Sequence, residues 1–132
     1  MSNVQQLPIG VFDSGVGGLS VLKVLQEQFP NEDFIYIGDN ANNPVGNRSD
    51  DEITYLACHI AEALEKQPVK LMVIACNTFT VVALDAVRER VSVPVIGVSQ
   101  GVKTAISQSK SKTIGIMATA ATVNSCLLYT SP

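Results

Sequence analysis

A cysteine followed by two polar residues ends one of the apolar runs in this sequence. Cys76 closes the run 70–75, and Asn77 and Thr78 stand after it, where a helix is expected to begin. The positive end of a helix dipole favours the nucleophilic or basic thiolate, and the neighbouring amide and hydroxyl donors suit an anionic ligand. The alternative is that Cys76 is a small buried hydrophobic residue and Asn77 only a helix cap. Two donors at a strand end favour the chemical role.

A glycine-rich turn follows the first apolar run. Gly15 and Gly17 come directly before an expected helix, and Asp39 ends the second run, a spacing that is typical of dinucleotide-binding turns. Ser20, however, occupies the position of the third glycine, and Asp13 would place a carboxylate beside the bound pyrophosphate, where like charges repel. The dinucleotide interpretation is therefore disfavoured, and a glycine turn with an exposed acid stays open as an alternative.

Four other residues are weaker candidates for chemistry. Cys58 and His59 are adjacent within an expected helix and so lie on different faces, which predicts a core cysteine and a surface histidine. Thr119 and Thr122 follow the fifth expected strand and would face the same cleft as the other strand ends. Threonine is also common at helix starts because its hydroxyl caps backbone amides.

Strand and helix patterns alternate along the chain. Apolar runs predict strands over 8–12, 34–38, 70–75, 94–98 and 113–117, and helical periodicity predicts helices over 18–29, from 49 onward, 78–90 and 100–107. Ser49 and Glu52 form a capping box at the second helix. The apolar stripe of the first helix comprises Leu19, Leu22, Leu25 and Phe29. The alternation predicts an α/β fold with a doubly wound, mostly parallel sheet, which binds ligands at the carboxyl ends of its strands.

Composition bounds the class of protein. The chain has 132 residues, is 46% hydrophobic and carries a net charge of −3, which argues against disorder and against nucleic acid as the main partner. Its longest unbroken apolar run, 71–76, is too short to span a membrane, and the N-terminus does not resemble a secretory signal. Three cysteines without a Cys-x-x-Cys pair, together with a single histidine, favour reduced thiols in a cytoplasmic setting and no metal site.

Charge is unevenly distributed, since all twelve acidic residues lie at or before Glu89. This shift favours a domain boundary near 94–100 about as much as a chance run within one domain.

Five segments in order resemble glutamate racemases. They are 9–19 (IGVFDSGVGGL), 39–49 (DNANNPVGNRS), 74–78 (IACNT), 94–98 (PVIGV) and 115–122 (GIMATAAT). The resemblance implies a cofactor-independent amino acid racemase that supplies D-glutamate for bacterial peptidoglycan in the cytoplasm. It also implies two similar α/β domains with the small-molecule substrate between them, without nucleic acid or membrane partners. The oligomeric state is left open, with a homodimer as one alternative.

The resemblance also assigns roles to residues. Cys76 would be one of two thiols that remove and return the Cα proton from opposite faces, and Asp13 would assist it. The substrate-binding residues would be Ser14, Pro44, Val45, Gly46, Asn77, Thr78, Thr119 and Thr122.

The chain departs from the family pattern in two places. Val45 replaces the aromatic residue of the family's Pro-Tyr-Gly loop, which removes a hydroxyl contact. Nothing resembles the second Cys-Thr-His motif, which belongs to the later half of the family's chain. The expected organisation is a first domain over 1–98 that lacks its C-terminal return, the start of a second over 99–125, and a non-native tail over 126–132.

Cys126, in this tail, is not expected to be the second catalytic thiol, so the chain is expected to be inactive alone. An aspartate racemase and a non-catalytic ligand-binding fragment are the alternatives.

Overall fold

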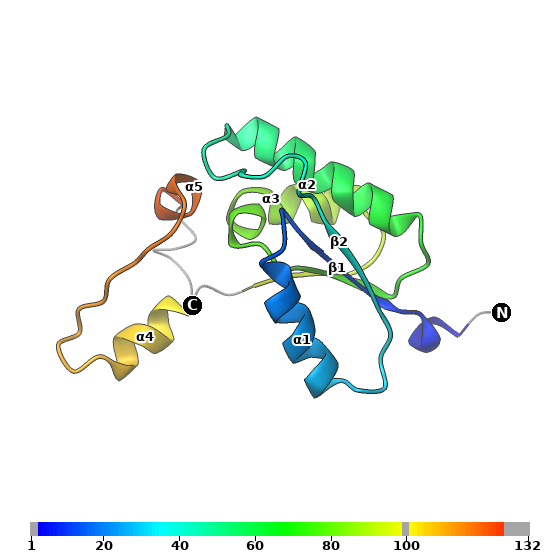
Figure 1. Ribbon diagram of the computed structural model, residues 1–132, viewed down its shortest axis with the longest axis horizontal. Coiled ribbons are helices and arrows are strands. Elements are labelled where there is room, and N and C mark those ends of the chain that lie inside the picture. The colour runs from blue at the N-terminus through cyan, green and yellow to red at the C-terminus, as the bar shows by residue number, and fades with distance from the viewer. Residues whose placement is uncertain (1–2, 99–100, 126–132) are drawn as a thin grey trace.

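Four parallel strands form the centre of the protein, whose computed structural model describes residues 3–98 and 101–125. The strands are β1 (Ile9–Asp13), β2 (Phe34–Gly38), β3 (Leu71–Ile74) and β4 (Val95–Gly97). The helices that connect them are α1 (Gly18–Gln28), α2 (Asp50–Glu65) and α3 (Asn77–Arg90). Figure 1 shows α1 on one face of the sheet and α2 and α3 on the other. The predicted doubly wound α/β fold is confirmed.

The strand order β2-β1-β3-β4 determines where a ligand site can form. The chain passes from β1 outward to β2 on one side, and then from β3 outward to β4 on the other. Loops after β1 and β3 therefore diverge and leave a crevice at the carboxyl ends of these two strands. The register pairs Phe12 with Ile74, so the residues that follow them are neighbours at that edge.

Most of the apolar core lies between the sheet and the helices α2 and α3. The rings of Phe12 on β1 and Phe79 on α3 lie 6.2 Å apart within it. A smaller cluster lies beneath α1, where Leu22 and Leu25 pack against the sheet. The remaining members of the expected α1 stripe, Leu19 and Phe29, are about half exposed, because the apolar contact of α1 with the sheet is narrow.

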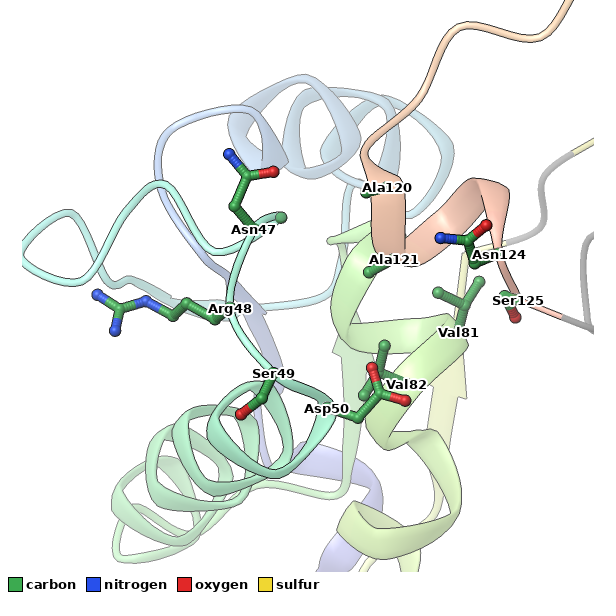
Figure 2. A pocket seen from close by; sticks show the side chains of 11 residues that line it. Asn47, Arg48, Ser49, Asp50, Val81, Val82, Ala120, Ala121, Asn124 and Ser125 are labelled. Carbon is green, nitrogen blue, oxygen red and sulfur yellow. The ribbon is translucent and has the colours of Figure 1, made fainter.

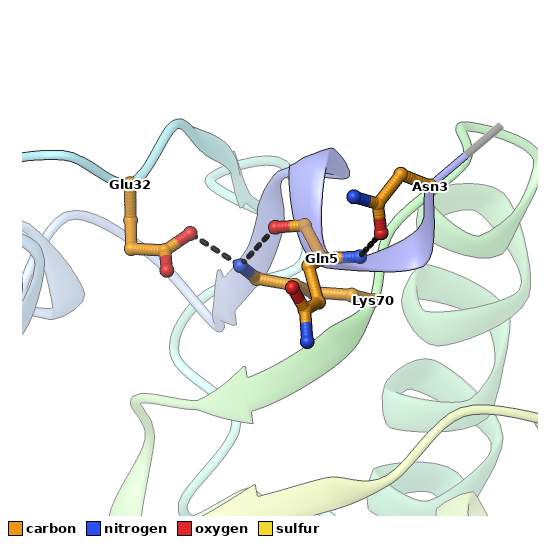
Figure 3. A network of polar contacts seen from close by, with 4 residues as sticks. All are labelled: Asn3, Gln5, Glu32 and Lys70. Carbon is orange, nitrogen blue, oxygen red and sulfur yellow. Dashed lines mark hydrogen bonds and ion pairs between the residues drawn. The ribbon is translucent and has the colours of Figure 1, made fainter.

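A polar network joins the segments that precede three strands, at the edge opposite the crevice. Figure 3 shows the Lys70 ammonium between the carbonyl oxygen of Gln5, at 2.8 Å, and the carboxylate of Glu32, with which it forms an ion pair. Asn3 caps the short 3₁₀ helix η1 (Val4–Gln6) by accepting a hydrogen bond from the Gln5 amide. The network fastens the amino ends of β1, β2 and β3 together and lies away from the candidate site.

Helix α2 begins as its sequence predicts. Ser49 is the N-cap, and its Oγ accepts a hydrogen bond from the Glu52 amide at 3.2 Å, which confirms one half of the predicted capping box. Within the ranges that the structure describes, no helix combines the length and apolar character needed to cross a membrane.

The segment after β4 agrees with the prediction only in part. The helix expected over 100–107 is present as α4 (Val102–Gln108), and α5 (Ala120–Val123) follows, but the strand expected over 113–117 is absent from the described residues. A strand needs a neighbour whose backbone groups complete its ladder. Here the segment lies largely exposed between α4 and α5, away from the sheet (Figure 1). The tail over 126–132, Cys126 included, lies outside the described residues.

Candidate active site

Asp13 ends β1 and caps the following helix. Asp13 is buried, with 5% of the residue exposed, and its Oδ2 accepts a hydrogen bond from the Gly18 amide at 2.7 Å. The N-cap residue of α1, Gly17, forms no side-chain cap of its own. A pyrophosphate at this turn would need the amides at the start of α1, and Asp13 already occupies one of them. This contact is a second reason to disfavour a dinucleotide site.

Cys76 lies between β3 and α3 and is the N-cap of α3. Its Sγ accepts a hydrogen bond from the Phe79 amide at 3.5 Å. Its carbonyl oxygen accepts bonds from the Thr80 hydroxyl at 2.8 Å and the Thr80 amide at 3.0 Å. The side chain is 8% exposed. The thiol therefore lies at the amide-rich end of α3, a position that stabilises negative charge on sulfur.

Cys76 and Ser14 bring the two strand ends together. The Cys76 thiol donates a hydrogen bond to Ser14 Oγ at 3.4 Å, and Ser14 is half-buried in the turn after β1. Cys76 is part of the main apolar core cluster, as a small buried hydrophobic residue would be. Its sulfur also has two polar partners, the Ser14 hydroxyl and the Phe79 amide, which a purely hydrophobic role does not require.

Tyr36 is a neighbour of this pair that the sequence analysis did not identify. Its hydroxyl donates a hydrogen bond to the carbonyl oxygen of Gly15 at 2.8 Å. Burial, and then the negative charges of Asp13 and Cys76, raise the pKa of the Tyr36 hydroxyl above its ordinary value. No local sequence pattern identifies Tyr36, because its contact depends on the fold of the turn after β1.

Three threonine hydroxyls join α3 to α5. The Oγ1 atoms of Thr78 and Thr119 share a hydrogen bond of 3.0 Å, and Thr119 Oγ1 donates to Thr122 Oγ1 at 3.2 Å. Thr119 is also the N-cap of α5 and accepts a hydrogen bond from the Thr122 amide. Thr78 and Thr122 are buried. Thr119 and Thr122 therefore lie beside the carboxyl end of β3, although the fifth strand that was expected to precede them is absent from the described residues.

The loop residues 44–46 lie in three different environments. Pro44 is exposed and follows a cis peptide bond, whereas Val45 is 4% exposed and packs in the core cluster with α2 and α3. A Cβ atom on Gly46 would lie 2.5 Å from Thr119 Cγ2, so the loop backbone touches the threonine group directly. This contact places Gly46 beside Thr119, another predicted site residue.

Asn77 is exposed at the start of α3 and borders a cavity of about 220 Å³. The cavity separates the first turn of α3 from the segment after β4. Its other lining residues are Val102, Ala105, Ile114, Gly115, Ile116, Met117, Ala118 and Thr122.

A cavity of about 480 Å³, larger than the one that Asn77 borders, lies beside the candidate site. Figure 2 shows it between the start of α2, α3 and α5. Its lining residues are Gly46, Asn47, Arg48, Ser49, Asp50, Val81, Val82, Ala120, Ala121, Asn124 and Ser125. Cys76, Ser14 and Thr78 do not line it, so size alone does not identify the chemical centre.

Cys58 and His59 lie apart from the strand ends, as predicted. Cys58 is buried, and this burial is the main cause that raises the pKa of its thiol above the ordinary value. His59 is exposed and stacks on Tyr55 with ring centroids 5.9 Å apart. Among the residues that the structure describes, no cluster of three His, Cys, Asp or Glu side chains could hold a metal ion.

Residues 9–129 match the family model described as Asp/Glu/Hydantoin racemase. The chain is 50% identical over 116 residues to the glutamate racemase of Herpetosiphon aurantiacus. This alignment covers 88% of the chain and 46% of the relative. The chain therefore spans about half the length of the curated relatives it matches.

Solved structures agree with this similarity. The glutamate racemase of Aquifex pyrophilus has a TM-score of 0.81 and 43% identity, and the match covers 89% of this chain and 47% of that one. A Francisella tularensis glutamate racemase, solved in complex with D-glutamate, has a TM-score of 0.76 and 43% identity, with 90% and 45% covered.

Proposed function

The chain belongs to the Asp/Glu/Hydantoin racemase family, and on that premise we propose that it forms one face of a racemase that interconverts L- and D-glutamate without a cofactor. The observation that carries the proposal is the Cys76 thiol, placed at the amide-rich start of α3 and hydrogen-bonded to Ser14. Both residues lie at the edge where a sheet of this strand order binds its ligands.

The proposed reaction is a proton transfer at Cα. The thiolate of Cys76 takes the Cα proton as its C–H bond breaks, which leaves the electron pair on a carbanion next to the substrate carboxylate. An acid on the opposite face then returns a proton and inverts the centre. By family resemblance that acid is a thiol of the second domain, and Asp13 assists Cys76.

The proposed substrate contacts come from three places in the fold. The side chains of Asn77 and Thr78 at the start of α3, together with Ser14, can donate to the substrate carboxylate and accept from its amino group. Gly46 adds backbone groups, and Val45, being buried, could contribute only through its backbone. The remaining proposed contacts are Pro44, Thr119 and Thr122.

The proposed organisation is a first domain over 1–98 and the start of a second over 99–125. The product would be D-glutamate for peptidoglycan, made in the bacterial cytoplasm. A single thiol can remove and return a proton on one face only, so the 132 residues by themselves are proposed to leave the configuration unchanged.

Calorimetric titration tests the ligand class. The purified chain is titrated separately with D- and L-glutamate, D- and L-aspartate and NAD, and binding of a glutamate enantiomer is expected. Thr78→Val should weaken this binding, whereas His59→Ala on the far side of α2 should not change it. Preferential aspartate binding would favour an aspartate racemase, and NAD binding without amino acid binding would contradict the proposal.

A further inference from the structure

The geometry points to Tyr36 as a positioning residue that holds Ser14 against the thiol of Cys76 through the carbonyl of Gly15. The inference rests on the proposed function, because it concerns how the reactive sulfur keeps its polar partner. Tyr36 would not touch the substrate, and its effect would pass through the turn after β1.

Strand β2 contacts the turn after β1 directly. The Tyr36 hydroxyl donates to the carbonyl oxygen of Gly15 at 2.8 Å, across 21 residues of sequence. A Cβ atom on Gly38, two residues further along β2, would lie 2.3 Å from the same oxygen. The turn thus rests directly on the backbone of β2, and the Tyr36 hydroxyl supplies the hydrogen bond that orients its carbonyl.

Ser14 lies between two neighbours that hydrogen bonds hold in place. Before it, the Asp13 carboxylate is held by the Gly18 amide at 2.7 Å. After it, Gly15 is buried and held by Tyr36. With both neighbours held, the Ser14 Oγ atom has a defined place, 3.4 Å from the sulfur of Cys76. Loss of the Tyr36 hydroxyl releases one of these two supports.

The Tyr36 hydroxyl stays protonated beside two acidic groups. A tyrosine hydroxyl is protonated at neutral pH already at its ordinary pKa of 10.0, and burial, followed by the negative charges of Asp13 and Cys76, raises the pKa of Tyr36 further. A protonated hydroxyl is a donor, and the Gly15 carbonyl oxygen is an acceptor. The contact therefore persists over the pH range in which a cysteine thiolate forms.

The test is the pH profile of Cys76 alkylation by iodoacetamide in the 132-residue chain, with each cysteine followed by peptide mass spectrometry. The variants are Tyr36→Phe, Ser14→Ala and the double variant. Tyr55→Phe, on the exposed side of α2, is the matched control. Tyr36→Phe should slow labelling at pH 7 about tenfold and move the profile to higher pH. The Ser14 hydroxyl accepts a hydrogen bond from the neutral thiol but can donate one to the thiolate, and a displaced Ser14 would lose that bond to a charged atom.

Non-additivity is the decisive readout. If Tyr36 acts through Ser14, the double variant should label no more slowly than Ser14→Ala alone. Multiplied effects in the double variant, or an unchanged profile in Tyr36→Phe, would overturn the inference. 4-Aminophenylalanine at position 36 retains a donor and should restore the labelling rate of Cys76. Slow labelling of this variant, if it folds, would also overturn the inference. The variant therefore keeps the inference testable even if Tyr36→Phe fails to fold. In the unchanged chain, Cys76 labelling no faster than that of Cys58 would instead contradict the proposed function.

Discussion

The Cys76 thiol donates a hydrogen bond to the Ser14 hydroxyl, with Sγ and Oγ 3.4 Å apart although the two residues are 62 positions apart in sequence. The contact follows from the parallel pairing of β1 with β3, which places the residues after Phe12 and Ile74 side by side. Neither residue reaches the other through local structure. The strand order therefore brings the site together, and substitutions that displace the turn after β1 should change the reactivity of the Cys76 sulfur.

Cys76 should react with iodoacetamide near neutral pH well before Cys58. The Cys76 sulfur lies at the start of α3, where it accepts a hydrogen bond from the Phe79 amide, whereas burial raises the pKa of Cys58 and keeps it in the less reactive thiol form. Peptide mass spectrometry after timed labelling of the folded chain measures both rates. Equal or slower labelling of Cys76 would return it to the role of a small buried hydrophobic residue.

Gly38→Ala should destabilise the fold by about 1–3 kcal/mol, the usual cost of forcing an extra methyl group into a packed site. Its Cβ would lie 2.3 Å from the Gly15 carbonyl oxygen, which is backbone and cannot rotate away. Gly17→Ala is the matched control, since its Cβ would meet Asp13 Oδ2 at an ordinary 3.7 Å. Urea denaturation measures both, and equal midpoints for the two variants would show that β2 does not support the turn.

Gly46→Ala should weaken glutamate binding about tenfold, the effect of losing one buried hydrogen bond. The new Cβ would lie 2.5 Å from Thr119 Cγ2, so Thr119 must shift, and we expect this shift to disturb its 3.0 Å hydrogen bond with Thr78. Gly115→Ala is the control, because its Cβ would meet nothing within 4 Å. Calorimetric titration gives both affinities, and an unchanged affinity for Gly46→Ala would remove the threonine group from the site.

The placement of the site at the β1 and β3 ends was predictable from sequence. Apolar runs alternating with helical patterns identify a parallel sheet, and the carboxyl ends of its strands lie on one edge. Polar residues directly after those runs, such as Ser14 and Cys76, must then lie near each other. The adjacency of Cys58 and His59 within a helix was enough to separate their environments.

What the sequence missed depends on tertiary partners. The apolar residues over 113–117 have strand character, but a strand forms only beside a neighbour, and this segment lies next to α4 and α5 instead. Val45 reads as a loop residue, yet the approach of α2 and α3 provides a core that buries it. The bond from Tyr36 to Gly15 depends on the fold of the turn after β1, which no local pattern describes.

Stability at alkaline pH should depend on Tyr36. Its pKa in the folded chain is raised above the ordinary value of 10.0, so between these two values the folded chain binds more protons than the unfolded chain. The free energy of unfolding therefore falls as pH rises from 10.0 through the raised pKa. Tyr36→Phe should show a smaller fall than the unchanged chain in urea denaturation at successive pH values. Parallel pH dependences in the two chains would be incompatible with a buried, protonated Tyr36.

Deuterium exchange at the Cα atom of glutamate tests the role of Cys76 most directly. The 132-residue chain is incubated with D- and L-glutamate separately in deuterated water, and Cα deuterium and optical rotation are followed together. One thiol on one face should exchange one enantiomer only, without loss of rotation, and Cys76→Ala should abolish the exchange. Equal exchange of both enantiomers, rotation lost at an enzymatic rate, or exchange that persists in Cys76→Ala would contradict the assignment of Cys76 as the base.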